Sequence, residues 1–303
     1  MTGSWEALSA ELAQAVARTG PSVAALKGGT RGVGSAVHWR EGHFVTTDHS
    51  LSPEGAHAVL LPDGSTAAVR GVLRDRGTDL AVISTEAKLP ALEPAPAQTL
   101  EPGRLVLTVG RGEESGINAT WGIISAVSGP WRTWRGGRLD HYIRLDAAMH
   151  PATTGGAVID SAGRLIGIAS NGLSRVAGVA IPCSTIARVV DDLLSRGQVA
   201  RGWLGVGLQP VPLHESVRRR TGIQEEGGLI VLTVEPGSPA EAAGLIVGDI
   251  VLHVAGKPMR DTDDLLAVLE EHGPGREVAI QLLHGGAAAQ VRATVGERAR
   301  KGD

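Results

Sequence analysis

The stretch Leu145-Asp-Ala-Ala-Met-His-Pro-Ala-Thr-Thr-Gly-Gly-Ala-Val-Ile159 decides how the whole chain is interpreted. Its last three residues form a short apolar run, and the turn sequence Asp160-Ser-Ala-Gly163 follows directly. A second apolar run begins at Leu165. Short apolar runs that are separated by Gly, Asp and Ser predict strands joined by hairpin turns. This part of the chain is therefore predicted to be β-structure, with a glycine-rich loop ahead of the hairpin.

The same pattern of short apolar runs separated by turn residues continues on both sides of this loop. The sequence predicts strands at residues 22–26, 34–38, 44–46, 58–61, 67–72, 80–84, 105–109, 121–127, 157–159, 165–169 and 177–181. A hairpin turn is predicted at Pro62-Asp-Gly-Ser65. The 42 glycines favour a turn-rich architecture over a helical one. Roughly a dozen short strands at this spacing indicate antiparallel barrels, and we expect two barrels of six strands each.

Two helices flank this region. Residues 4–18 carry apolar side chains at helical spacing, and Gly20-Pro21 is placed to end that helix. A second helix is predicted after Pro182, with one apolar stripe and a stop at Gly197. The stripe consists of Ile186, Val189, Val190, Leu193 and Leu194.

The remaining residues have a different pattern, which indicates a separate domain of ordinary size. Strands are predicted at 204–208, 229–234, 250–254 and 278–283, around a helix near 262–272. The predicted organisation is an N-terminal helix over 1–20, a barrel domain over 21–199, a small α+β domain over 200–298, and a disordered tail over 299–303.

Composition excludes several classes of protein. The net charge of −3 in 303 residues, without long charged blocks, gives no indication of nucleic-acid binding. One cysteine, Cys183, cannot form an internal disulfide and is expected to be a buried apolar residue. No apolar run is long enough to span a bilayer. The start lacks a signal peptide, so the chain as written is expected in the cytoplasm; a truncated chain would read the same, and could be periplasmic or extracellular.

Five segments resemble the HtrA (Deg) family, in which a trypsin-like protease domain precedes a PDZ domain. In chain order they are Gly34-Ser-Ala-Val-His-Trp-Arg-Glu-Gly-His-Phe-Val-Thr-Thr-Asp-His49, Thr78-Asp-Leu-Ala-Val82, Thr120-Trp-Gly-Ile-Ile-Ser-Ala126, the stretch 145–159, and Gly178-Val-Ala-Ile-Pro182. The order His, Asp, nucleophile is that of trypsin. The resemblance implies a mainly β fold, with a trypsin-like double antiparallel barrel followed by an α+β PDZ domain.

The resemblance also assigns catalytic roles. His49 would be the general base, Asp79 would orient its ring, and Thr154, directly before Gly155-Gly156, stands where the family has a nucleophilic serine. Threonine keeps a hydroxyl, but its β-branch restricts χ1. Threonine nucleophiles usually have the N-terminal amine as their general base, and the internal Thr154 has no such amine. Thr153 also carries a hydroxyl, but it stands one residue before the nucleophile position that Gly155-Gly156 define.

The oxyanion hole implied by the resemblance is altered as well. It would be built from the loop residues Ala152, Thr153 and Thr154, with the amides of Ala152 and Thr154 as donors, and the family has glycine where Ala152 stands. Loss of one such donor costs about 10²–10³ in rate. We therefore expect a catalytically impaired pseudoprotease that acts as scaffold, regulator or holdase. The alternative is an active endopeptidase in protein quality control, with Thr154 as nucleophile.

The last domain resembles an HtrA-type PDZ domain at Arg201-Gly-Trp-Leu-Gly-Val-Gly207 and at Val234-Glu-Pro-Gly-Ser-Pro-Ala-Glu-Ala-Ala-Gly-Leu-Ile-Val-Gly-Asp-Ile-Val251. The resemblance implies binding of C-terminal or unfolded peptide segments by strand addition and carboxylate capture. Leu204, Gly205 and Val206 would supply amides, and Val206, Leu265 and Leu269 an apolar pocket. The alternative is a purely structural docking module.

The family commonly forms trimers, so a homotrimer is expected, to which Trp5 on the first helix could contribute. No cofactor is implied by the resemblance. His38 and His43 flank a hairpin, but metal-ligand spacing does not recur elsewhere in the sequence, and no metal site is expected.

Overall fold

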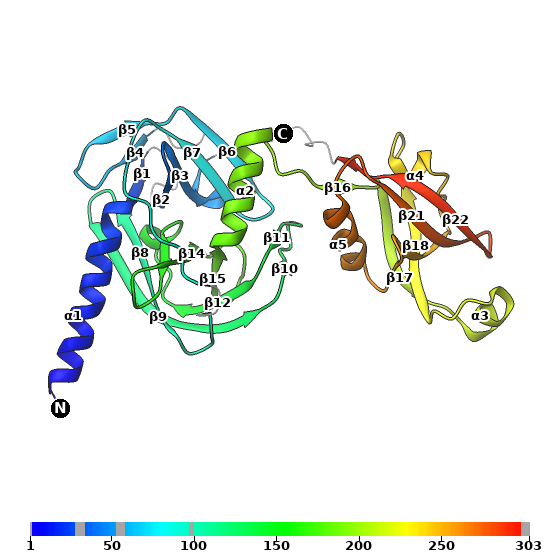
Figure 1. Ribbon diagram of the computed structural model, residues 1–303, viewed down its shortest axis with the longest axis horizontal. Coiled ribbons are helices and arrows are strands. Elements are labelled where there is room, and N and C mark those ends of the chain that lie inside the picture. Colours follow the sequence, from blue (N-terminus) through cyan, green and yellow to red (C-terminus); the bar gives the residue numbers. More distant parts are fainter. Residues whose placement is uncertain (1, 28–33, 53–57, 97–99, 298–303) are drawn as a thin grey trace. The chain divides into compact units, whose positions relative to one another are not determined.

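The computed structural model describes residues 2–27, 34–52, 58–96 and 100–297. The chain divides into two compact units, Met1–Val199 and Ala200–Asp303 (Figure 1). The predicted disordered tail at 299–303 lies outside the described residues. Mainly β structure, with a trypsin-like barrel unit followed by a PDZ-like unit, is confirmed. No described helix is both long enough and apolar enough to span a membrane.

The first sheet of the N-terminal unit contains seven of the described strands, in the order β5-β4-β1-β2-β3-β7-β6. The bounds are β1 (Val23–Lys27), β2 (Ser35–Arg40), β3 (His43–Thr47), β4 (Ala58–Leu60), β5 (Thr66–Ala68), β6 (Gly71–Asp75) and β7 (Leu80–Ser84). All neighbouring pairs are antiparallel. The expectation of six strands in this half was wrong.

The extra strand comes from the predicted strand at 67–72, which is two strands in the structure. Only Val69 and Arg70 separate β5 from β6, although these strands lie at opposite edges of the sheet. Three Cα–Cα steps span at most about 11 Å. The two edges therefore come close together, and the sheet is curled into a barrel-like shape.

The second sheet closes into a six-stranded barrel in the order β12-β15-β14-β13-β8-β9. Its strands are β8 (Leu105–Gly112), β9 (Gly116–Ser128), β12 (Tyr142–Ala147), β13 (Ala157–Ile159), β14 (Leu165–Ser170) and β15 (Gly178–Pro182). Strand β12 is not predicted from the sequence, because Ile143 and Leu145 are its only buried apolar residues and make too short a pattern. A short hairpin of β10 (Trp131–Arg132) and β11 (Arg138–Leu139) precedes β12.

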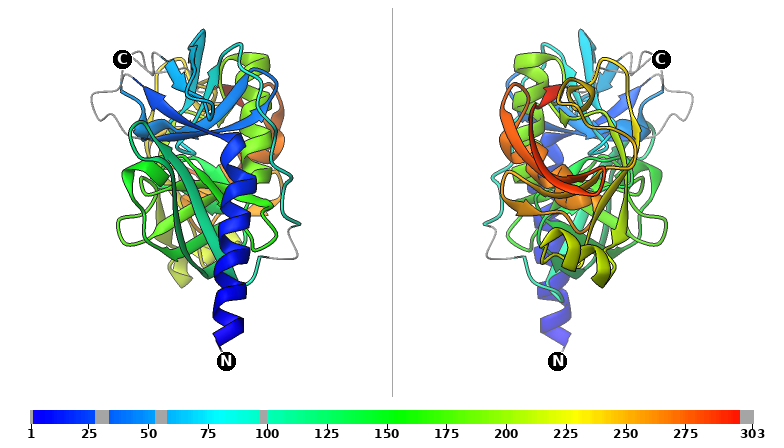
Figure 2. Two further views of the ribbon diagram at one scale, coloured as in Figure 1. Left: turned by 90° about the vertical axis from the view of Figure 1, so that its left-hand side faces the viewer. Right: turned by 90° about the vertical axis from the view of Figure 1, so that its right-hand side faces the viewer.

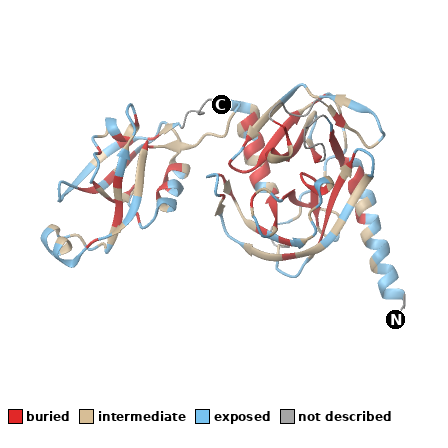
Figure 3. Ribbon diagram, turned by 180° about the vertical axis from the view of Figure 1, so that it is seen from behind, coloured by how far each residue is buried: buried red, intermediate tan, exposed pale blue. Residues whose placement is uncertain are grey.

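Two α-helices flank the barrels. Helix α1 (Thr2–Thr19) leads through η1 (Gly20–Ser22) into β1, and its exposed N-terminal half extends beyond the barrels (Figures 2 and 3). Helix α2 (Cys183–Arg196) buries the predicted stripe in the barrel core. Gly197 ends α2 with φ 74°, and its amide donates to the carbonyl of Leu193, as predicted. Both predicted hairpin turns also form, at 62–65 and 160–163.

The C-terminal unit is built on a six-stranded sheet, in which β17-β18-β19-β21-β22 pair in this order and β20 pairs with β19. Its strands are β16 (Gly202–Trp203), β17 (Val206–Pro212), β18 (Gly227–Val234), β19 (Ile250–Val254), β20 (Lys257–Pro258), β21 (Glu277–His284), β22 (Ala287–Thr294) and β23 (Gly296–Glu297). Its helices are α3 (Glu215–Thr221), α4 (Pro239–Ala242) and α5 (Thr262–His272). Strand β22 is not predicted, since its residues are mostly exposed alanines and polar side chains.

Candidate active site

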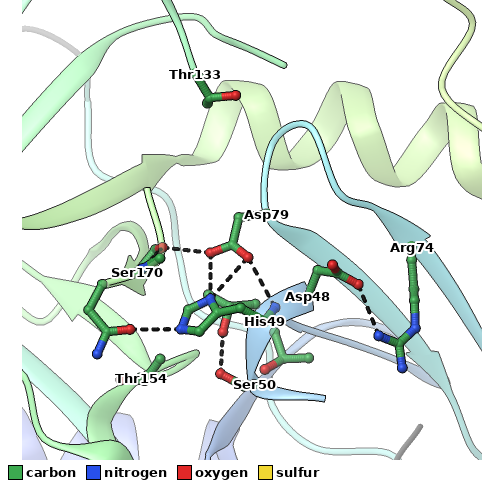
Figure 4. A network of polar contacts seen from close by, with 12 residues as sticks. Asp48, His49, Ser50, Arg74, Asp79, Thr133, Thr154 and Ser170 are labelled. Atoms are coloured by element: carbon green, nitrogen blue, oxygen red, sulfur yellow. Dashed lines mark hydrogen bonds and ion pairs between the residues drawn. The ribbon is translucent and has the colours of Figure 1, made fainter. Parts of the chain in front are cut away.

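His49 lies where β3 leaves the first sheet. The strand ends in a single 3₁₀ turn, η2 (Asp48–Ser50), which carries the histidine. The amide of Asp48 donates to the carbonyl of Asp79 at 3.0 Å, and its buried carboxylate pairs with Arg74 at 3.0 Å. Figure 4 shows this ion pair on the far side of the turn from Asp79. The turn, and with it His49, is therefore held from two sides.

Asp79 is the most constrained residue of the site. It directly precedes β7, is 1% exposed, and has φ 59° in the left-handed region. Aspartate tolerates this conformation better than most residues, because its side chain can bond locally. Its carboxylate accepts from the Nδ1 of His49 at 2.7 Å, from the His49 amide at 3.1 Å, and from the hydroxyl of Ser170 at 2.6 Å (Figure 4). The structure thus brings His49 and Asp79 together in triad-like geometry.

The pKa of His49 is raised above its ordinary value. Burial is the largest single cause and lowers the pKa, because it disfavours the charged ring. The hydrogen bond and the negative charge of Asp79 raise it, as does the hydrogen bond to Asn171. The positive charge of Arg135 opposes them. The net direction is upward, so the protonated imidazole is favoured.

The other ring nitrogen of His49 has a partner outside the nucleophile loop. Its Nε2 lies 2.7 Å from the amide oxygen of Asn171, a residue in the segment that follows β14. Neither Ser170 nor Asn171 was singled out from the sequence. The sequence carried no signal for them, because Ser170 directly follows the predicted strand 165–169 and Asn171-Gly172 resembles an ordinary turn.

Thr154 is buried, 4% exposed, and its hydroxyl donates to the carbonyl oxygen of His150 at 3.2 Å. The preceding residues form the 3₁₀ turn η4 (Pro151–Thr153). The amide of Thr154 donates to the carbonyls of His150 and Pro151, at 3.1 and 3.2 Å, and the amide of Thr153 donates to that of His150 at 2.9 Å. Of the two amides expected as oxyanion donors, those of Ala152 and Thr154, the amide of Thr154 is thus engaged inside its own turn, as is the neighbouring amide of Thr153.

The nucleophile loop is anchored to the first sheet through Ser35. The hydroxyl of Ser35 donates to the carbonyl of Ala152 at 2.7 Å, and its amide donates to the carbonyl of Thr154 at 2.9 Å. Gly155 has φ 77°, and a Cβ there would lie 2.3 Å from the carbonyl oxygen of Ser35. Only glycine fits at this position, which explains the first glycine of the Gly155-Gly156 pair.

The other chemically reactive side chains have structural environments. Within the described part of the chain, no group of three His, Cys, Asp or Glu could hold a metal ion. His38 is buried, with its ring edge-on to Phe44. Burial raises the pKa of the Cys183 thiol to about 12, so this sulfur stays protonated at neutral pH.

The proposed peptide-binding residues lie in the C-terminal unit around β17. Leu204, Leu265 and Leu269 belong to one buried core cluster, and Val206 packs against it. Leu265 and Leu269 are only 6% and 3% exposed, so they are mainly core residues. Gly205 turns the chain into β17 with φ 77°. The carbonyl of Leu204 accepts from Ala240, which ties this entry loop to α4.

Comparison with known proteins is consistent with this geometry over both units. The family model described as a trypsin-like peptidase domain matches residues 34–168, and the PDZ domain model matches residues 202–295. The solved structure of the HtrA-type protease AlgW with decapeptide is 30% identical and superposes with a TM-score of 0.77, covering 95% of this chain and 98% of that one. The chain belongs to the HtrA/DegP family.

Further members of the HtrA/DegP family are similar over most of this chain. The serine endoprotease from Yersinia pestis is 28% identical with a TM-score of 0.75, covering 94% of this chain and 97% of that one. The probable periplasmic serine endoprotease DegP-like of Rhizobium meliloti is 33% identical over 84% of this chain and 51% of the relative. The serine protease Do-like HtrA of Lactobacillus helveticus is 34% identical over 81% of this chain and 63% of the relative. The chain therefore spans about half to two thirds of the length of these curated relatives.

The raised pKa of His49 predicts a pH-dependent contribution to stability. A group whose pKa is higher in the folded state stabilises fully below its unfolded pKa of about 6.5. That contribution is lost as pH rises through the folded value. We expect the urea midpoint of the wild type to fall relative to that of Asp79→Asn between pH 6 and pH 9. Asp63→Asn, in an exposed turn, is the matched control and should follow the wild type. Parallel curves for wild type and Asp79→Asn would contradict the assignment.

Proposed function

We propose that this HtrA/DegP-family protein is catalytically impaired and binds peptide segments through its PDZ domain, as a scaffold, regulator or holdase. The observation that carries the proposal is the pairing inside the site. The Thr154 hydroxyl donates to His150, while the Nε2 of His49 contacts Asn171. A general base must reach the proton that it removes, directly or through one water.

Two further features support impairment. The methyl group of Thr154 restricts rotation about χ1, so the hydroxyl has few ways to turn from His150 toward His49. The amide of Thr154, one of the two expected oxyanion donors, is bonded to the carbonyls of His150 and Pro151 and would have to be released before it could stabilise an oxyanion. Each feature raises the barrier to acyl transfer independently of the other.

The alternative function is an active endopeptidase in protein quality control with Thr154 as nucleophile, His49 as base and Asp79 as orienting residue. The intact hydrogen bonds of Asp79 with His49 and Ser170 favour it, since a chain without catalysis has no need of a buried carboxylate there. The curated relatives bear protease names as well. In this case the amides of Ala152 and Thr154 would form the oxyanion hole after the loop rearranges.

Labelling with a fluorophosphonate probe distinguishes the two functions. We expect no adduct on wild-type Thr154, because its hydroxyl donates to the carbonyl of His150 and the Nε2 of His49 is paired with Asn171. Intact-mass spectrometry after incubation checks this, with Thr154→Ala as the matched background. An adduct that maps to Thr154 in the wild type, together with casein cleavage that Thr154→Ala abolishes, would overturn the proposal.

Peptide binding is supported by the edge of the C-terminal sheet. Among the described strands, β17 pairs only with β18, so its other edge can accept an added strand. The entry loop that contains Leu204 and Gly205 lies at the start of this edge, where backbone amides could capture a carboxylate. Solved relatives named as carrying a decapeptide or a tripeptide share the fold.

We expect a fluorescent peptide with an apolar free C-terminus to bind more tightly than its C-terminally amidated form. The physical reason is that amidation removes the charge that the backbone amides would receive. Fluorescence anisotropy titration of both peptides against the full chain measures the difference. Equal affinities would favour the alternative of a structural docking module.

We also propose a homotrimer that uses α1. Trp5 is 73% exposed on the part of α1 that extends beyond the barrels. Exposed large aromatic side chains are enriched at interfaces. Light scattering should show that Trp5→Ala shifts the chain toward monomer, whereas Trp134→Ala, 71% exposed in the β10–β11 hairpin, should not. A monomeric wild type would refute the trimer.

A further inference from the structure

Ser170 at the end of β14, and Asn171 and Gly172 directly after it, lie against the imidazole of His49 or the carboxylate of Asp79. Ser170 donates to Asp79 and also accepts from the amide of Gly172 at 3.2 Å. A Cβ built on Gly172 would lie 2.6 Å from the Nδ1 of His49, so the backbone of Gly172 lies directly against the ring. Three consecutive residues thus contact either the ring or the carboxylate that orients it.

Asn171 supplies the contact with the most direct chemical consequence. Its amide oxygen lies 2.7 Å from the Nε2 of His49 and can only accept a hydrogen bond. The Nδ1 of the same ring faces the carboxylate of Asp79, another acceptor. Both ring nitrogens therefore carry protons in this arrangement, and the ring has no lone pair with which to remove a proton from a nucleophile.

We propose that Asn171 is an autoinhibitory positioning residue, whose amide oxygen holds the Nε2–H of His49 and so prevents the ring from acting as general base. The inference rests on the proposed function, because it names a cause of impaired catalysis that is separate from the methyl group of Thr154. For His49 to act as a base, the Asn171 side chain must leave Nε2 and the Nε2 proton must pass to water. The freed lone pair can then accept the proton of a hydroxyl.

The charges around His49 favour the same state. The carboxylate of Asp79, which precedes β7, faces the ring, while Arg135 in the β10–β11 hairpin opposes its effect. Asp48, the neighbouring residue in η2, is already paired with Arg74. The hydrogen bond to Asn171 acts in the same direction as Asp79 and raises the pKa of His49.

Titration of His49 by NMR in the full chain tests the proposal without requiring activity. The His49 resonance is identified by its loss in His49→Gln. Asn171→Ala should lower the pKa of His49, since an acceptor of the Nε2 proton is removed, and Asn171→Asp should raise it. Asn118→Ala is the matched control and should leave it unchanged, because the side-chain amide of Asn118 bonds Ser115 and Gly116 in the β8–β9 hairpin. The other histidines report whether each variant is folded. An unchanged His49 pKa in both Asn171 variants would overturn the proposal.

A second experiment uses variants in which Thr154 is replaced by the serine that the family has at this position. The rate of fluorophosphonate labelling is compared between Thr154→Ser and the double variant Thr154→Ser with Asn171→Ala. We expect the double variant to be labelled faster. The upper limit of the increase in rate is the factor of about 10²–10⁴ that a positioned general base contributes. Equal labelling rates would contradict the role of Asn171. Labelling of wild-type Thr154 would instead contradict the proposed function, so failures of the two proposals are distinguishable.

Discussion

The carboxylate of Asp79 is the contact on which the site depends. It is almost completely buried, and a buried charge is strongly unfavourable unless donors compensate for it. Three donors do so here: the ring and the amide of His49, from the first sheet, and the hydroxyl of Ser170, from the second barrel. The carboxylate therefore links the two barrels of the N-terminal unit at the point where the site lies.

This network sets the orientation of the histidine. The nucleophile loop is connected to β14, which carries Ser170, by backbone bonds of Gly155 and Gly156 to Ala169. It is also anchored to the first sheet, through the bonds of Ser35 to Ala152 and Thr154. The amides of Thr153 and Thr154 are bonded inside the loop itself. The polar contacts given for the Thr154 hydroxyl and for the Nε2 of His49 therefore lead to different partners, His150 and Asn171. The proposed impairment of catalysis rests on this difference.

The C-terminal unit has its own hydrophobic core and its own candidate binding surface. Apolar residues of β18, β19, β21 and α5 form its buried core, and β17 packs against this core through the partly buried Val206 and Leu208. Among the described strands β17 pairs only with β18, which leaves its other backbone edge open to a ligand. Recognition through backbone hydrogen bonds and a terminal carboxylate depends little on the side chains of the ligand. A scaffold that receives many different exposed C-termini would need this property.

The sequence by itself determined the family, the mainly β fold and the pairing of His49 with Asp79, whereas the role of Thr154 as nucleophile stays a prediction. It could do so because local motifs in a fixed order specify these features: apolar runs, turn residues, and the Gly155-Gly156 pair. It did not indicate β12, the splitting of the predicted strand 67–72, or the residues Ser170 and Asn171. The tertiary structure alone decided these, since pairing between distant strands brings Asn171 to a ring 122 positions away in sequence. Hydrogen bonds between such distant residues leave no periodic or local pattern in the chain, so only the folded geometry shows which partner each polar group has.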